Sequence, residues 1–248
     1  MLIPPNSMTP AQEEGWRVLL DLYEEFPVGW CIIGGQMVWL LAHEYGVEPI
    51  RATEDVDVVA DIRADQQMLT RLCSWLEYRG IKLEGIDTDN IGHRYVSTTY
   101  NGPGRVAIDV LAPDNVGERA NLTTSPPART VSAPGTRGAL DAVEPLEILL
   151  GGRSGHVLRP PLISAIFAKV AATGIPGRKN PERDWADVAF LLSLVPDPVG
   201  TAAELTNRQR QRLRTVSDLL REDHVAWRPL GSRSRREGIA ALRFFINA

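Results

Sequence analysis

The sequence is short of the residues on which several kinds of site depend. It has two cysteines, Cys31 and Cys73, and four histidines. Two cysteines cannot form a disulfide framework, and these positions do not have the spacing of zinc ligands. No run reaches the roughly 18 apolar residues of a candidate membrane-spanning helix, and the start, Met1 to Asn6, lacks the basic and apolar regions of a signal peptide. We therefore expect a cytoplasmic protein without structural disulfides or zinc.

Lysine is also scarce, because arginine supplies all basic residues except Lys82, Lys169 and Lys179. The net charge of −4 argues against a generally basic nucleic-acid-binding protein. The charge is uneven, however. Residues 206–248 hold ten arginines and four acidic residues, so this segment is about +6 and the rest about −10. Such a segment is either a solvated helical face or a surface that contacts phosphates.

The apolar pattern predicts an α+β fold, with a mixed β-sheet flanked by helices and a mostly helical C-terminal domain. We place a first domain, which contains the sheet, at 1–140 and the helical domain at 141–248. The expected strands are 30–33, 55–59, 81–86, 94–100, 106–111 and a short one near 129–131. A turn at 101–104 joins two of them. The expected helical segments are 10–26, one from about 36, 64–79, 145–150, 161–172, 181–194 and 204–221.

Three aspartates lie in or beside the apolar strands. Because a strand has a period of two, Asp55 and Asp57 project from one face while Val56 and Val58 enter the other. Two neighbouring carboxylates repel each other unless a positive charge lies between them, and Mg²⁺ or Mn²⁺ prefers such oxygen ligands. Asp109 lies within another apolar strand, where an unpaired carboxylate is costly. Three such carboxylates could hold the two metal ions of a phosphoryl-transfer site.

The glycine pair Gly34-Gly35 fits the same chemistry. It follows the apolar strand 30–33 and precedes a helix, and backbone N–H groups at such a turn can approach an anion closely. Alone, a Gly-Gly pair is usually only a turn. An Asp-x-Asp motif is often a pair of exposed surface aspartates without a functional role, or the manganese site of a sugar-nucleotide glycosyltransferase. Their combination with a third aspartate is more specific.

This order of motifs resembles the signature of the nucleotidyltransferase superfamily related to polymerase β. The segment 51–57, Arg-Ala-Thr-Glu-Asp-Val-Asp, and the helical second half resemble more narrowly the AbiEii/MenA-type nucleotidyltransferases, the toxins of abortive-infection and type IV toxin–antitoxin systems. Their later motif is a lysine-bearing helix followed by basic residues and two aspartates. It is matched here by Lys169, Arg178, Lys179, Arg183, Asp184 and Asp187. The resemblance covers roughly residues 30–194.

The resemblance implies a metal-dependent transfer of NMP from an NTP to an acceptor hydroxyl, plausibly the 3′ end of tRNA. Gly34, Gly35 and Thr53 would hold the NTP phosphates. Asp55, Asp57 and Asp109 would bind Mg²⁺ or Mn²⁺, with Asp109 also helping to deprotonate the acceptor. Lys169 would contact the triphosphate, Asp184 would orient basic groups, the arginine-rich segment would grip the RNA, and a cognate antitoxin would be a further partner.

Other interpretations of these residues stay open. Lys169 borders the apolar stripe of its expected helix and could be a boundary residue with its charge in solvent. Asp184 could cap a helix or pair with Arg183 or Arg178. His93 is more typical of a turn or surface. The acceptor could be a small hydroxylated molecule such as an aminoglycoside, or a protein. The fold could also serve as a catalytically silent module that binds a partner.

Overall fold

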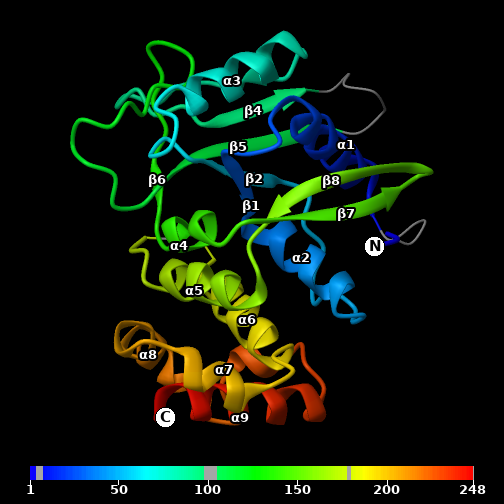
Figure 1. Ribbon diagram of the computed structural model, residues 1–248, viewed down its shortest axis with the longest axis vertical. Coiled ribbons are helices and arrows are strands. Elements are labelled where there is room, and N and C mark those ends of the chain that lie inside the picture. Colours follow the sequence, from blue (N-terminus) through cyan, green and yellow to red (C-terminus); the bar gives the residue numbers. More distant parts are fainter. Residues whose placement is uncertain (4–7, 98–104, 178–179, 248) are drawn as a thin grey trace.

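The computed structural model describes residues 1–3, 8–97, 105–177 and 180–247. A sheet-containing part and a helical part lie at opposite ends of the molecule (Figure 1). The helices are α1 (Pro10–Glu25), α2 (Gly34–Glu44), α3 (Met68–Tyr78), α4 (Thr136–Asp141), α5 (Leu162–Thr173), α6 (Pro181–Ser193), α7 (Pro198–Glu204), α8 (Asn207–Arg214) and α9 (Ser232–Asn247), with 3-10 turns η1 (Ser217–Leu220) and η2 (Val225–Trp227). The strands are β1 (Trp30–Ile33), β2 (Val56–Ala60), β3 (Lys82–Leu83), β4 (Arg94–Ser97), β5 (Val106–Pro113), β6 (Ser132–Ala133), β7 (Glu144–Leu150) and β8 (Arg153–Arg159).

Within the described residues, six strands form one mixed sheet in the order β1-β2-β5-β4-β3, with β6 paired to β5. The β2–β5 pair is parallel, whereas β1–β2, β4–β5 and β3–β4 are antiparallel. Helices pack on this sheet and a helical part follows it, so the predicted α+β class is confirmed. The predicted turn at 101–104 lies outside the described residues.

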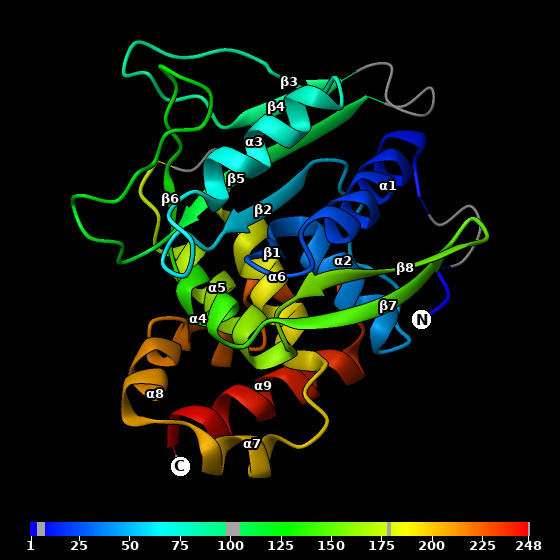
Figure 2. The ribbon, with the colours of Figure 1, turned by 45° about the horizontal axis from the view of Figure 1, so that its top comes forward.

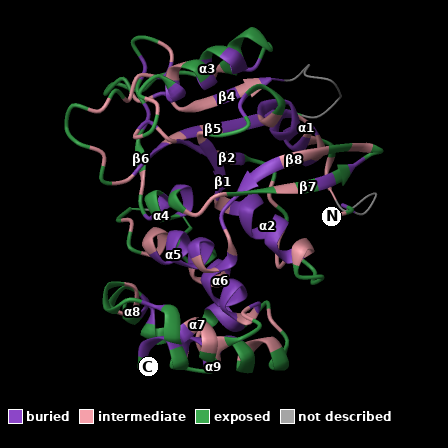
Figure 3. Ribbon diagram, viewed as in Figure 1, coloured by how far each residue is buried: buried purple, intermediate pink, exposed green. Residues whose placement is uncertain are grey.

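The two faces of the central strands have different surroundings. Val56 and Val58 of β2 belong to the large core that also includes Trp16 and Leu19 of α1. On the opposite face, Cys31, Ile33 and Val59 form a small apolar cluster with Leu140 of α4. Asp57 and Asp109 alternate with the core valines, so they lie on this second face. Figure 3 shows how completely β1, β2 and β5 are buried.

The predicted helical segment 145–150 is wrong, because these residues form strand β7 of a two-stranded hairpin with β8. Ile148 and Leu150 are buried while Glu147 and Leu149 are exposed, which is the period of two of a strand. Gly151 and Gly152 connect the two strands with φ of 55° and 84°. The glycine- and arginine-containing turn is thus a hairpin connection.

The predicted helix 204–221 is also wrong, because the chain breaks it twice. Leu205 is extended, and Thr206 begins α8 with a capping box in which its hydroxyl accepts from the backbone of Gln209. Helix α8 then ends at Arg214, and a separate 3-10 turn follows. The helices predicted at 161–172 and 181–194 agree with α5 and α6 within two residues.

The division at residue 140 stays a prediction. The β7–β8 hairpin lies just beyond it and crosses α1 and β1 of the preceding half (Figure 2). Among the described residues no single helix is long and apolar enough to cross a membrane; α6 and α7 pass together by length and composition only, with a 108° bend between them.

A candidate active-site cleft between the sheet and helices α5 and α6

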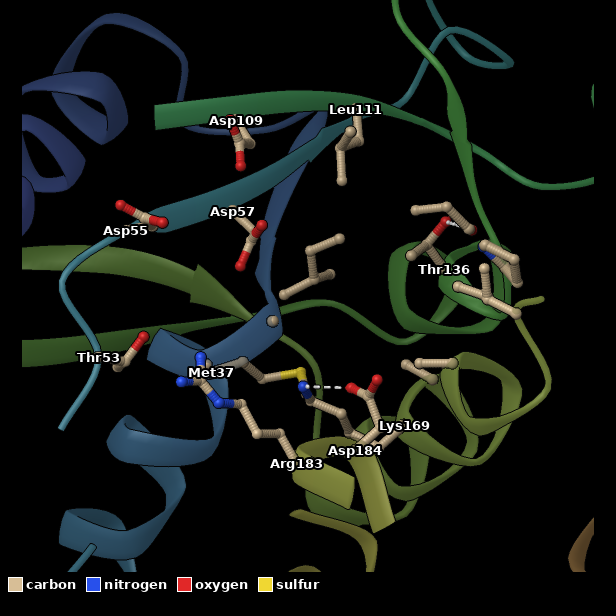
Figure 4. Close-up of a pocket in the computed structure, with 18 of the residues that line it drawn as sticks. Met37, Thr53, Asp55, Asp57, Asp109, Leu111, Thr136, Lys169, Arg183 and Asp184 are labelled. Atoms are coloured by element: carbon tan, nitrogen blue, oxygen red, sulfur yellow. Dashed lines mark hydrogen bonds and ion pairs between the residues drawn. The ribbon is translucent and has the colours of Figure 1, made fainter. Parts of the chain in front are cut away.

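A cleft of about 650 Å³ lies between the second face of the sheet and helices α5 and α6. It brings together all eight residues proposed from the sequence. They enter from the start of α2, from the segment before β2, from β2 and β5, and from α5 and α6: Gly34, Gly35, Thr53, Asp55, Asp57, Asp109, Lys169 and Asp184. Figure 4 shows the three strand aspartates on one wall and the Lys169–Asp184 pair on the other.

The register of the sheet sets the aspartates side by side. Asp57 and Asp109 are direct partners on the parallel strands β2 and β5, and Asp55 precedes β2 on the same face. The side chain of Asp109 is only 13% exposed, whereas that of Asp55 is 51% exposed. The wall therefore carries neighbouring carboxylates that differ in access to solvent.

Gly34 and Gly35 begin α2 directly beneath this wall. Gly34 has φ of 67°, and a Cβ there would lie 2.5 Å from Asp57 Cγ and 2.9 Å from Asp57 Cβ. A Cβ at Gly35 would lie 2.5 Å from the hydroxyl oxygen of Thr53. Any side chain would therefore displace Asp57 or Thr53, so glycine is required by close approach as well as by backbone conformation.

Gln36 fixes the segment that carries Thr53. Its side chain is fully buried and donates from Nε2 to the Thr53 carbonyl at 2.9 Å. Its Oε1 accepts from the side chains of Trp16 at 3.0 Å and Gln12 at 3.1 Å. This network ties α1, α2 and the segment before β2 together, and the sequence interpretation did not include it.

The most important residue missed from the sequence is Arg94 of β4. Its Nε and Nη2 donate to the two carboxylate oxygens of Asp109 at 2.8 Å and 2.7 Å, and Nη2 also donates to Asp55 at 3.0 Å. The hydrogen bond from Asp109 and the charges of both aspartates raise the pKa of Arg94 above its usual range. The positive charge expected between these carboxylates is thus a guanidinium of the chain itself.

A second charge cluster joins the two walls. Lys169 Nζ lies 2.8 Å from Asp187 Oδ2 and 3.4 Å from Asp184 Oδ1. Arg51, before β2, donates from Nε and Nη2 to both oxygens of Asp187, at 3.2 Å and 2.8 Å. Burial by itself raises the pKa of Asp187. The charges and hydrogen bonds of Lys169 and Arg51 lower it by more, so the pKa lies below its ordinary value. Lys169 is therefore buried and paired rather than a boundary residue in solvent.

Two other residues of the cleft differ from the sequence interpretation. Arg183 is exposed and extends from the start of α6 toward α2 (Figure 4). It pairs with no acid among the described residues, so it is not the partner of Asp184. His93, expected at a turn or surface, lines the cleft, and its Nδ1 is buried without a hydrogen-bond partner in the described part of the chain. Arg178 and Lys179 lie outside the described residues.

The donor atoms of the strand wall fit a hard divalent cation, because they are carboxylate oxygens with the Thr53 hydroxyl nearby. Asp55, Asp57 and Asp109 are the residues that would hold it. These aspartates fit a cation by their chemistry but not by their present positions, because no three His, Cys, Asp or Glu side chains among the described residues are arranged as the ligands of a metal ion. Arg94 already pairs with two of the three aspartates.

The arginine-rich segment is outside the cleft. Helices α8 and α9 lie on the side of α5 and α6 that faces away from the sheet (Figure 1). Arg210 donates to the carbonyls of Ala202 and Phe245, and Arg214 donates to that of Ile246. Arg208 and Arg212 have no such partner in the described part of the chain. The segment thus combines structural arginines with arginines open to solvent.

Comparison with known proteins adds little. No protein-family model matches the chain, and no curated protein matches it significantly. A solution structure of the antibiotic-resistance factor ANT(2'')-Ia aligns with 95% of this chain and 93% of that chain, at 14% identity and a TM-score of 0.34. A likeness at that level assigns no activity, so the function has to be argued from the cleft.

Proposed function

We propose that this protein is a metal-dependent nucleotidyltransferase that transfers an NMP group from an NTP to an acceptor hydroxyl. The observation that carries the proposal is the meeting of the Gly34–Gly35 turn with Asp55, Asp57 and Asp109 in one cleft. The turn exposes backbone that can bind phosphate, and the carboxylates supply oxygen ligands for a cation. A nucleoside triphosphate with its metal ions needs both.

The start of α2 is the proposed binding site for the phosphates. Its N-cap residue, Ile33, makes no side-chain hydrogen bond to the helix, so the first N–H groups and the positive end of the helix can attract an anion. Thr53 lies beside Gly35, and Arg183 extends toward the same turn from α6. Arg183 has no acidic partner among the described residues, and we propose that it contacts the triphosphate together with Lys169.

In the proposed reaction, the acceptor hydroxyl attacks the α-phosphorus as Asp109 takes its proton. A bond forms between the acceptor oxygen and the α-phosphorus, while the bond from the α-phosphorus to the oxygen that bridges it to the β-phosphorus breaks. Pyrophosphate then leaves with the charge of that oxygen. Mg²⁺ or Mn²⁺ held by the aspartates would neutralise the phosphate oxygens. Lys169 and Arg183, on the opposite wall, would stabilise the negative charge of the leaving group.

For the acceptor, we propose the 3′ end of an RNA, plausibly tRNA, which would make the protein a toxin of the abortive-infection type with a cognate antitoxin. The solvent-exposed arginines of α8 support an RNA acceptor, because exposed arginines bind the phosphate backbone. An RNA bound there has to pass around α5 and α6 to reach the cleft. The volume of the cleft, about 650 Å³, also suits a small hydroxylated acceptor such as an aminoglycoside.

The test is to incubate the protein with Mg²⁺ and each α-labelled NTP, adding total tRNA, an aminoglycoside panel, a protein extract or nothing. We expect labelled RNA with the wild type and none with Asp57→Asn. Label on small molecules alone would replace RNA by the small-molecule acceptor, and label on protein alone would favour a protein acceptor. No label from any mixture, with wild type and Asp57→Asn behaving alike, would favour the silent binding module.

A further inference from the structure

The position of Arg94 bears on how the aspartates receive a metal ion. Its guanidinium binds both oxygens of Asp109 and one oxygen of Asp55. These contacts occupy the carboxylate edges that a cation would approach. A guanidinium cannot lose its proton under ordinary conditions, so Arg94 cannot yield its place by becoming neutral.

The Arg94 side chain has space to move within the cleft. Its side chain is 39% exposed and it lines the cleft itself. Its contact with Asp55 is a single hydrogen bond on a half-exposed carboxylate, whereas its contact with Asp109 is bidentate. Release from Asp55 therefore breaks the weaker of the two contacts.

Charge balance decides when this release is favourable. A free divalent cation placed among the aspartates meets the positive charge of Arg94 at close range, where repulsion is strong. A cation that arrives with a triphosphate brings several negative oxygens, and these can receive the guanidinium. The anion thus removes the repulsion that opposes the metal alone.

On the basis of the proposed function, we infer that Arg94 is the resident counter-ion of Asp55 and Asp109, and that it releases Asp55 and one oxygen of Asp109 when a metal–triphosphate complex binds. Arg94 holds the aspartates in place without metal, weakens the binding of free metal, and then pairs with the triphosphate. It is a positioning residue that couples the binding of the cation to the binding of the nucleotide.

The test measures Mn²⁺ binding by electron paramagnetic resonance rather than activity. We expect Arg94→Gln to bind free Mn²⁺ about tenfold more tightly than the wild type, since one opposing charge is removed. Arg105→Gln is the matched control, because Arg105 pairs with Glu84 at the surface of the same sheet. It should bind Mn²⁺ like the wild type. An α,β-methylene nucleoside triphosphate, tried with each base, should tighten Mn²⁺ binding more in the wild type than in Arg94→Gln.

Thermal unfolding in EDTA and in Mn²⁺ gives a second measurement. Arg94→Gln should melt below the wild type in EDTA and gain more from Mn²⁺, because the metal replaces the lost counter-ion. If Arg94→Gln does not fold, Arg94→Lys takes its place. A lysine keeps the opposing charge but leaves part of the carboxylate edges that Arg94 occupies open, so its Mn²⁺ affinity should exceed that of the wild type by less than the roughly tenfold increase expected from removing the charge.

The outcomes separate the inference from the proposed function. Mn²⁺ affinity that is unchanged or reduced in the Arg94 variants, but lost in Asp57→Asn, would overturn the role of Arg94 and leave the metal site intact. Mn²⁺ that binds neither the wild type nor the Arg94 variants saturably, with or without nucleotide, would remove the metal-dependent function itself.

Discussion

Gly34→Ala tests the close approach of the Gly34 backbone to the Asp57 carboxylate, on which the proposed function depends. The new Cβ would lie 2.5 Å from Asp57 Cγ, well inside ordinary contact, so the Asp57 side chain has to move by roughly 1 Å. A displacement of that size at a catalytic group can reduce a rate about 100-fold. The left-handed conformation costs alanine about 1–2 kcal/mol. Alanine also lowers the conformational entropy of the unfolded chain, which offsets about 0.4–1 kcal/mol of that cost. We therefore expect the backbone alone to cost about 1 kcal/mol of stability, and the displacement of Asp57 to add to that loss.

Gly46→Ala supplies the matched control at the other end of the same helix. Gly46 has φ of 68°, against 67° for Gly34, but nothing lies within 4 Å of its Cβ position. Urea unfolding should show the same backbone cost in both variants, with a further loss in Gly34→Ala from the displacement of Asp57. Labelled NMP transfer should fall about 100-fold in Gly34→Ala alone, given the sensitivity to 1 Å displacements. Equal transfer rates in the two variants would refute the argument that Asp57 has to occupy the space above Gly34.

Three further predictions concern the surroundings of the cleft. Asp187→Asn should lose about 3 kcal/mol at pH 7, the usual cost of breaking a buried ion pair. Because the pKa of Asp187 is lowered by folding, its contribution is full above about pH 4 and is lost as the pH falls further; urea unfolding from pH 7 to 2 should therefore show a flatter profile for the variant. Gln36→Met should cost about 2 kcal/mol or more in the same assay, since it leaves the partners of three hydrogen bonds unpaired. Replacing Arg208 and Arg212 by glutamine should lower the slope of the salt dependence of RNA binding by about 1.5 units, since each phosphate contact contributes about 0.7–0.9, without lowering the melting temperature. Arg210→Gln should instead lower the melting temperature.

The sequence predicts best where local pattern and local chemistry agree. Strand β1 ends where its apolar run ends, and Gly34-Gly35 begins α2 within two residues of the predicted start. The alternation in Asp55–Val59 fixes which of its side chains share a face, whereas the pairing of Asp57 with Asp109 comes from the register of β2 and β5. These features depend on neighbouring residues, so they can be read from a single segment.

Prediction fails where a distant segment decides. The segment 145–150 begins with a proline and contains leucines that suit a helix, but pairing with β8 turns its alternate residues into a buried strand face. The break in the predicted helix 204–221 has a local cause instead, because α7 ends at Glu204 and Thr206 caps the start of α8. A threonine followed three residues later by glutamine is a capping signal that could have revealed this break.

Arg94 is a source of positive charge that the sequence argument did not consider. Neighbouring carboxylates in an apolar strand do require a positive charge, and the segment alone leaves the source of that charge open. A hairpin centred on the Asn101-Gly102 pair would set Arg94 opposite Asp109, and that is the register of β4 and β5 in the structure. Strand pairing therefore supplies the first counter-ion from the chain itself. A metal ion has to compete with this arginine, so the cleft's affinity for metal depends on a residue that no metal-binding motif contains.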